Sequence, residues 1–201
     1  MTGIVFLLEE ESARVLLEAV VERIRPPAST TAVRYVVFEG KQDLSRRLGR
    51  RLAGYVNTNA HFIVLRDQDA SDCRTVKSDL KRVCQTAGRP QAIVRIACRE
   101  LEAFYLGDLA AVENGLGVRG LATKADKAKF RNPDAIPSPS IELARLTKSA
   151  YQKVAGSRAI APHLDLDAPR SRSFRHLIAA IRAALEGTGA KRPRTARARG
   201  N

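Results

Sequence analysis

The stretch FIVLRDQDASDC, residues 62–73, sets an apolar run directly against a group of acidic residues. A short continuous apolar run bounded by polar residues is typical of a strand buried on both faces of a sheet. In open sheets built from such strands, functional groups gather where the strands end. The segment therefore predicts both a buried strand and the functional edge of its sheet. The acids that follow the strand are Asp67, Asp69 and Asp72.

Apolar runs and amphipathic segments alternate along the first half of the chain. This order predicts a Rossmann-like α/β fold with a mostly parallel four-stranded sheet and helices on both faces. The expected strands are 3–8, 32–38, 61–65 and 92–98. The expected helices follow them in residues 9–25, 40–55, 71–87 and 99–117, the last with a break near Gly107.

The second half of the chain loses this alternation, and we expect it to form a helical and irregular C-terminal extension that packs on the core. The segment 124–140 contains three prolines and is expected to be a long loop. Ser140 is a candidate cap for a helix over 141–151, and residues 156–173 are expected to be irregular. An amphipathic helix is expected over 174–185. The expected domains are a core at 1–116, the extension at 117–186 and a basic disordered tail at 187–201.

The chain is strongly basic, with a net charge of +14. The last fifteen residues carry five basic groups and no acidic one, so residues 1–186 retain a net charge of +9. Such a field attracts polyanions, and nucleic acid is the commonest of these. An arginine-rich composition without a polyanionic partner is the alternative.

The remaining composition indicates a cytoplasmic protein. Its three cysteines are an odd number without metal-ligand spacing, which suits a reducing compartment and argues against a disulfide framework. The first residues lack the basic flank of a signal peptide. No apolar stretch approaches the ~20 residues of a membrane span, so no membrane association is expected.

Acidic residues follow three of the four expected strands. In a parallel sheet these strand ends lie at one edge, so the acids are expected to come together. In an extended chain, residues i and i+2 point the same way, and two carboxylates so placed repel unless a cation lies between them. The acids are Glu9 to Glu11, Asp67 and Asp69, and Glu100 and Glu102.

Magnesium is the cation that such carboxylates and a phosphate substrate would share. Helix capping is the alternative, because Asp and Glu are favourable in the first turn of a helix. Asp69 and Asp72 are then caps of the third helix, and Glu10 and Glu11 belong to the first turn of the first. Capping is the preferred interpretation for Asp72, and metal binding is preferred for the set that follows the three strands.

The acid after strand one, the D-x-D after a later strand and the β/α order resemble a Toprim domain. This is the magnesium-binding fold of topoisomerases, primases and overcoming-lysogenization-defect nucleases. Four further stretches make the chain similar to a Toprim-like family, domain-of-unknown-function 4276, over roughly residues 4–185. They are FLLEEESARVLLEAVVERIRP, VRIACRELEAFYLGD, KAKFRNPDAIPSPSIEL and GSRAIAPHLDLDAPRSRSFRHLI.

The resemblance implies roles for individual residues. Glu9 matches the strand-one glutamate, which acts as general acid/base or metal ligand, and Asp67 and Asp69 match the metal-binding pair. Glu100 and Glu102 match acids that some Toprim nucleases use for a second ion. Toprim domains usually have glycine after the first glutamate, whereas this chain has Glu10, so either Glu9 or Glu10 is the working group.

The activity expected from this resemblance is magnesium- or manganese-dependent hydrolysis of phosphodiester bonds in DNA or RNA, with a role in phage defence. The chain lacks a Walker A sequence, so any ATPase would be a partner protein. The rival interpretations are a non-catalytic nucleic-acid-binding or regulatory subunit, and another phosphotransfer enzyme. The oligomeric state stays open, a dimer included. The candidate phosphate-binding residues are Arg46, Arg50, Arg158, Arg172 and Arg175.

Overall fold

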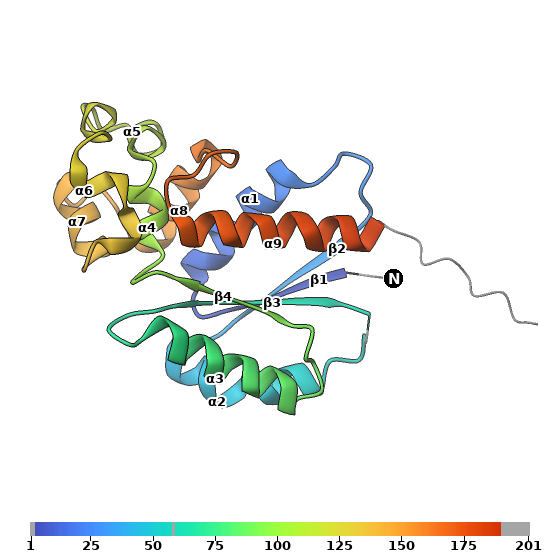
Figure 1. The fold of residues 1–201 in the computed structure, drawn as a ribbon. Helices are drawn as coiled ribbons and strands as arrows, with labels where there is room; N and C mark the ends of the chain where they lie inside the picture. Colours follow the sequence, from blue (N-terminus) through green and yellow to red (C-terminus); the bar gives the residue numbers. More distant parts are fainter. Residues whose placement is uncertain (1–2, 58, 190–201) are drawn as a thin grey trace, which may run out of the picture.

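The computed structural model describes residues 3–57 and 59–189, and its centre is a four-stranded parallel sheet (Figure 1). The strand order is β2-β1-β3-β4, and every pairing is parallel. The predicted α/β class and parallel sheet are therefore confirmed. The strands are β1 (Gly3–Leu8), β2 (Ala32–Val37), β3 (His61–Asp67) and β4 (Ile93–Ala97).

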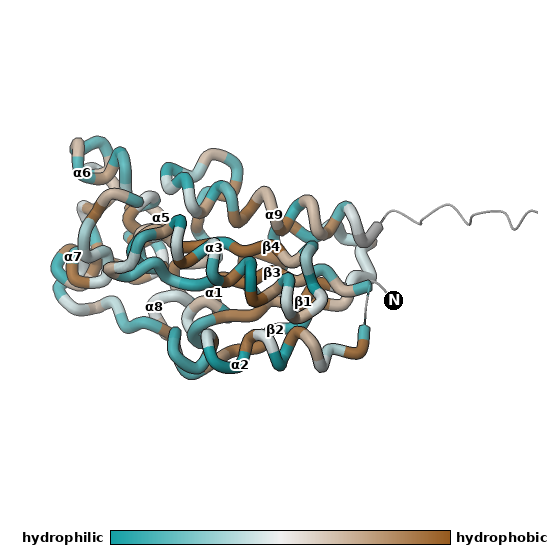
Figure 2. The backbone as a smooth tube through the Cα atoms, turned by 60° about the horizontal axis from the view of Figure 1, so that its bottom comes forward, coloured by the Kyte–Doolittle hydropathy of each residue, from teal (hydrophilic) through white to brown (hydrophobic). Residues whose placement is uncertain are grey.

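Helices cover both faces of this sheet. The strands carry apolar side chains on both faces, and a layer of helices on each side buries them. On one face, α2 (Lys41–Ala53) and α3 (Cys73–Thr86) pack against Val5, Leu7 and Val64. On the other face lie α1 (Glu11–Ile24) and the long α9 (Arg172–Gly189) (Figure 1). In Figure 2 the strands are largely hydrophobic, whereas hydrophilic residues are frequent along the helices around them.

The strand order places a topological switch point between β1 and β3. The connection after β1 leads to β2 on one side, whereas β3 pairs with β1 on its other side. Ligands of open α/β sheets bind at the carboxyl ends of the strands beside such a point. Leu8 of β1 pairs with Leu65 of β3, so the acids that follow both strands emerge next to each other.

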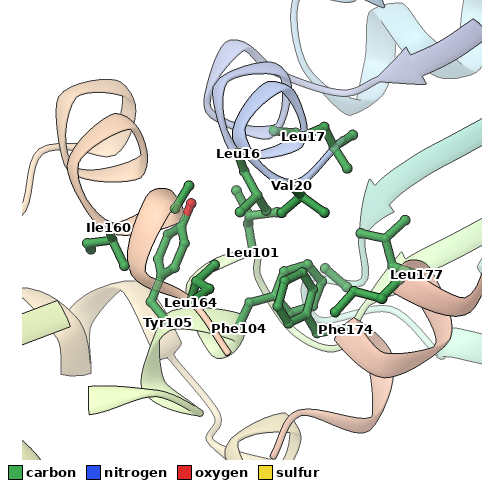
Figure 3. Packing of buried hydrophobic residues seen from close by; sticks show 14 of the residues in the cluster. Leu16, Leu17, Val20, Leu101, Phe104, Tyr105, Ile160, Leu164, Phe174 and Leu177 are labelled. Atoms are coloured by element: carbon green, nitrogen blue, oxygen red, sulfur yellow. The ribbon is translucent and has the colours of Figure 1, made fainter. Parts of the chain in front are cut away.

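The larger of two hydrophobic clusters joins the sheet to the C-terminal part of the chain. Leu16 and Val20 of α1 meet Phe104 and Phe174 in this cluster (Figure 3). The two phenylalanine rings stack with centroids 4.7 Å apart. This packing fixes the end of β4 and the start of α9 relative to α1, and these segments border the carboxyl edge.

The extension is more helical than the sequence predicted. The helix after β4 is interrupted at Gly107, as expected, but residues 156–173 are not simply irregular, because α8 occupies their first part. The expected helix over 141–151 starts and ends earlier, and Ser140 lies inside it rather than capping it. The helices are α4 (Glu102–Leu106), α5 (Leu109–Leu116), α6 (Ala128–Arg131), α7 (Pro139–Leu146) and α8 (Lys153–Ile160).

These short helices gather at the carboxyl end of the sheet, opposite the N-terminus (Figure 1). α8 packs on both α1 and α5, so the extension is part of the wall around the strand ends. The last helix continues to Gly189, beyond the predicted end at 185, and the rest of the expected basic tail lies outside the described residues. Within the described ranges, no helix is long and apolar enough to cross a membrane.

Candidate metal centre at the carboxyl edge of the sheet

Glu9 lies at the centre of the carboxyl edge, directly after β1. Its carboxylate accepts a hydrogen bond of 3.2 Å from the backbone N–H of Asp67, and the Arg66 guanidinium is 3.8 Å away. The side chain is 13% exposed. Burial raises the pKa of Glu9, the Asp67 N–H lowers it, and the nearby charge of Asp69 raises it again, with a net upward shift. Glu9 is therefore a partly desolvated carboxylate that holds its proton more tightly than usual.

Asp67 ends β3 and is the most perturbed acid of the edge. Burial raises its pKa well above the usual range, the charges of Glu10, Glu9 and Glu102 add to this rise, and Lys153 opposes it. Among the described residues, no group donates a hydrogen bond to its carboxylate. Acids that follow β1 and β4 thus act on Asp67 at the end of β3, so acids from three strand ends interact at this edge.

Asp69 has a different setting from Asp67. The strand ends at Asp67, and Asp69 has a positive φ of 55°, so the extended geometry assumed for the D-x-D pair is not found. Its carboxylate is 2.9 Å from the Lys41 ammonium at the start of α2. Its N–H donates to the carbonyl of Arg99, which also has a positive φ, of 63°. Asp69 and Arg99 are thus both in the left-handed region, which is uncommon for non-glycine residues.

Asp72 is the helix cap that the sequence predicted. Its side chain accepts a hydrogen bond of 2.8 Å from the backbone N–H of Thr75 at the start of α3. Donation from this N–H and from the Thr75 hydroxyl lowers the pKa of Asp72. The three aspartates of the opening stretch therefore have three separate environments.

Glu10 faces a cation that sequence reasoning missed. Its carboxylate is 2.6 Å from the ammonium of Lys153, the first residue of α8, and it also accepts a hydrogen bond from Ser12. Burial lowers the pKa of Lys153, but the hydrogen bond to Glu10 and the charges of Glu102 and Asp67 outweigh it and raise the pKa. Lys153 comes from a segment 143 residues away, and a lone lysine in such a segment carries no sequence signal.

Glu102 is a fully buried acid, at 0% exposure, in the first turn of α4. One of its oxygens, Oε1, accepts a hydrogen bond of 3.0 Å from the Tyr151 hydroxyl, whereas Oε2 has no partner among the described residues. Burial raises the pKa of Glu102, Lys153 opposes the rise, and Glu10 adds to it. A buried carboxylate oxygen without a partner costs several kcal/mol unless a proton or a cation satisfies it.

Glu100 is held by the extension instead. Its Oε2 accepts a hydrogen bond of 2.6 Å from the backbone N–H of Ser140 in the first turn of α7. This contact is a helix-capping interaction of the kind that the sequence offered as the alternative to metal binding. The structure places Glu100 and Glu102 in different environments, although only one residue separates them.

The edge therefore has two groups of charges around Glu9 and Asp67. One is on the α2 side, with Asp69, Lys41 and Arg66, and the other is on the α8 side, with Glu10, Glu102 and Lys153. Within residues 3–57 and 59–189, the side chains as placed do not bring three acid, histidine or cysteine groups together around one ion position. The donors nevertheless fit a hard divalent cation, since all are carboxylates and one buried oxygen lacks a partner.

The candidate phosphate-binding arginines are spread over several elements. Arg46 is exposed on α2 and pairs with Asp43. Arg158 of α8 lies close enough to Glu11 to lower the pKa of that acid, after the larger effect of Arg14. Arg172 and Arg175 are exposed on the first turn of α9, whose Ser173 accepts a hydrogen bond from the N–H of Cys98 after β4. Arg158, Arg172 and Arg175 thus lie on α8 and the start of α9, beside the carboxyl edge, and Arg50 is exposed further along α2.

The architecture and the acids at its carboxyl edge define a Toprim-like α/β protein. Among solved structures, the C-terminal region of the Burkholderia pseudomallei OLD protein is similar to this chain, with a TM-score of 0.54 and 18% sequence identity. The similarity covers 90% of this chain and 98% of that one. No curated protein sequence matches. The chain belongs to the domain of unknown function family DUF4276, whose family model matches residues 8–182.

Proposed function

We propose that this protein is a magnesium- or manganese-dependent nuclease that hydrolyses phosphodiester bonds at the carboxyl edge of its sheet. The observation that carries the proposal is the convergence of Glu9, Glu10, Asp67 and Glu102 in a partly desolvated site. Carboxylates kept together with raised pKa values are costly for stability, and such arrangements cluster at functional sites. The Toprim-like fold and its resemblance to nuclease domains support the same assignment.

Asp67, Glu9 and Glu102 are the groups that would hold the ion, with Asp69 and Glu10 released from their lysines as further ligands. The ion would neutralise the phosphodiester and lower the pKa of attacking water. Both lysine side chains are about half exposed, at 51% for Lys41 and 50% for Lys153, so both are free to move. Once displaced from the carboxylates, their ammonium groups are placed to bind phosphate oxygens.

Glu9 is the better candidate than Glu10 for proton transfer. Its raised pKa brings it closer to the value at which a carboxyl group exchanges protons near neutral pH. Glu10 is bound by Lys153 and Ser12, and it becomes available as a further metal ligand only when Lys153 is displaced. Exposed arginines on α8 and α9 would bind flanking phosphates.

The test is cleavage of labelled single- and double-stranded DNA and RNA with Mg²⁺ or Mn²⁺, comparing wild type with Asp67→Asn. This substitution keeps the size of the side chain and removes its charge, so we expect a loss of cleavage of at least a hundredfold in a folded protein. Asp72→Asn is the matched control, because Asp72 caps α3, and it should retain cleavage.

Three outcomes would decide against the proposal. Equal cleavage by wild type and Asp67→Asn would point to a contaminating nuclease. Binding of nucleic acid without cleavage under any metal condition would favour the non-catalytic subunit, whereas hydrolysis of small phosphate esters alone would favour another phosphotransfer enzyme. Because the proposal also includes an ATPase partner and a role in phage defence, cleavage is measured again after adding any ATPase that a neighbouring gene encodes.

A further inference from the structure

A pocket with arginine walls lies on the α2 face of the sheet, away from the acidic edge. Its volume is about 670 Å³, within the range of roughly 300–1,000 Å³ that is typical of ligand pockets. None of its lining residues is acidic. Four arginines line it, Arg34 of β2 and Arg47, Arg50 and Arg51 of α2.

Three of these guanidinium groups form no ion pair with the residues that the structure describes. Arg47 pairs with Asp43 at 3.2 Å. Within the described part of the chain, Arg34, Arg50 and Arg51 are exposed and form no ion pair. Several like charges around one pocket repel one another, so the pocket favours an anionic occupant with several oxygens, and arginine binds phosphate bidentately.

The floor of the pocket is apolar and aromatic, which distinguishes it from a simple anion site. It is formed by Val5, Leu7 and Val36 of the sheet together with Tyr55 and Phe62. The two rings meet edge to face with centroids 5.2 Å apart, and the Arg89 guanidinium braces Phe62 at 5.2 Å. A fixed apolar floor under arginine walls suits a ligand that joins a planar base to a phosphate.

The distance between the pocket and the acidic edge indicates how long a ligand must be to reach both. Lys41 at the start of α2 contacts Asp69, and Arg51 is ten residues further along this helix. Ten helical residues span about 15 Å. A stacked strand advances about 3.4 Å per nucleotide, so this distance corresponds to about four or five nucleotides.

We propose that the pocket binds one nucleotide of a single-stranded nucleic acid whose cleavable phosphate lies at the carboxyl edge. The phosphates contact Arg34, Arg50 and Arg51, and the base lies on the floor beside Tyr55. The inference rests on the proposed function and assigns the nuclease a second contact that holds the strand four or five nucleotides from the cleavage point.

The experiment measures binding in EDTA, where cleavage cannot occur, by fluorescence anisotropy of a labelled twelve-nucleotide oligothymidylate. We expect Arg34→Ala/Arg51→Ala to weaken binding about tenfold. Losing two phosphate contacts should also make the slope of log K against log salt less steep by about 1.4. An oligonucleotide with abasic sites should bind wild type at least about fivefold more weakly, because its bases cannot occupy the floor.

Arg119→Ala/Arg131→Ala is the matched control, since it removes the same charge from two exposed arginines of the extension. It should change the affinity less than twofold. Equal weakening by both double variants would show that only overall charge matters and would overturn the pocket. Unchanged binding by Arg34→Ala/Arg51→Ala, or no binding by wild type, would overturn it as well.

Two further measurements distinguish strand binding at the pocket from free-nucleotide binding and from the proposed nuclease activity. One outcome is that thymidine monophosphate binds wild type but not Arg34→Ala/Arg51→Ala, while both proteins bind the oligonucleotide with equal affinity. The pocket would then be a free-nucleotide site, and strand binding would be overturned. Cleavage with Mg²⁺ is measured separately. Binding that depends on the pocket, without cleavage, would contradict the proposed nuclease activity but not the pocket. Cleavage without binding that depends on the pocket would contradict the pocket but not the nuclease activity.

Discussion

At the residue scale, Asp67 shows how acids from two other strand ends act on one carboxylate. Burial and the charges of Glu10 and Glu9 raise its pKa, so the folded protein binds this proton more tightly than the unfolded chain does. Stability therefore falls as the pH rises from the unfolded pKa of about 4 towards the folded pKa, and the penalty is complete above it. An acid whose pKa is raised in this way costs the folded protein stability at neutral pH.

Asp67→Asn should remove this penalty. We expect the variant to be more stable than wild type at pH 7 by on the order of 1 kcal/mol in metal-free buffer, with the difference shrinking at pH 4 and below. Urea unfolding at both pH values measures this effect. A variant less stable than wild type at pH 7 would mean that the Asp67 carboxylate is already well compensated.

Lys153→Met should have the opposite effect, because it removes the cation that faces Glu10, Asp67 and Glu102. The pKa values of the remaining acids would rise further, so the variant should lose about 0.5–1 kcal/mol of stability at pH 8 and less at pH 5. Lys127→Met, an exposed lysine of the extension, is the control. A loss that does not depend on pH would show that Lys153 contributes only packing.

At the element scale, α4 and α8 determine how the buried Glu102 is held. Tyr151, just before α8, donates its hydroxyl to Glu102, and Gly156 of α8 lies under the Tyr151 ring. The buried Tyr105 hydroxyl of α4 donates to Ser157 at 2.7 Å and joins the same two helices. Sequence periodicity does not reveal the two hydrogen bonds, because each joins segments about fifty residues apart.

Gly156→Ala should test this arrangement, because its Cβ would overlap the Tyr151 ring. The ring would have to move and lose its hydrogen bond to Glu102, at a cost of about 2–3 kcal/mol of stability. Gly49→Ala in α2 is the control, since its Cβ would meet only Val83 at 3.4 Å and should stabilise the helix slightly. Equal denaturation midpoints for Gly156→Ala and wild type would contradict the packing described here.

At the scale of the whole molecule, a protein with a net positive charge carries an acidic edge. Binding of a divalent cation at this edge should stabilise the folded state. A ligand at 100 times its Kd stabilises the folded state by about 2.7 kcal/mol. We therefore expect Mg²⁺ or Mn²⁺ to raise the Tm of wild type by about 5–10 °C. Asp67→Asn should show little of this shift, and a shift of equal size in both proteins would place the ion elsewhere.

The sequence by itself determined the sheet, the alternation of strands and helices, the capping role of Asp72 and the edge at which the acids meet. Apolar runs, and the residues at which they end, are local features of the sequence. Parallel pairing then brings the carboxyl ends of the strands to one edge of the sheet. Only the tertiary structure decided that Asp69 pairs with Lys41 and that Glu100 caps α7. It also showed that Lys153 reaches Glu10 and that Glu102 is buried with one oxygen that has no partner among the described residues. These contacts join segments far apart in the chain, and no local pattern encodes them.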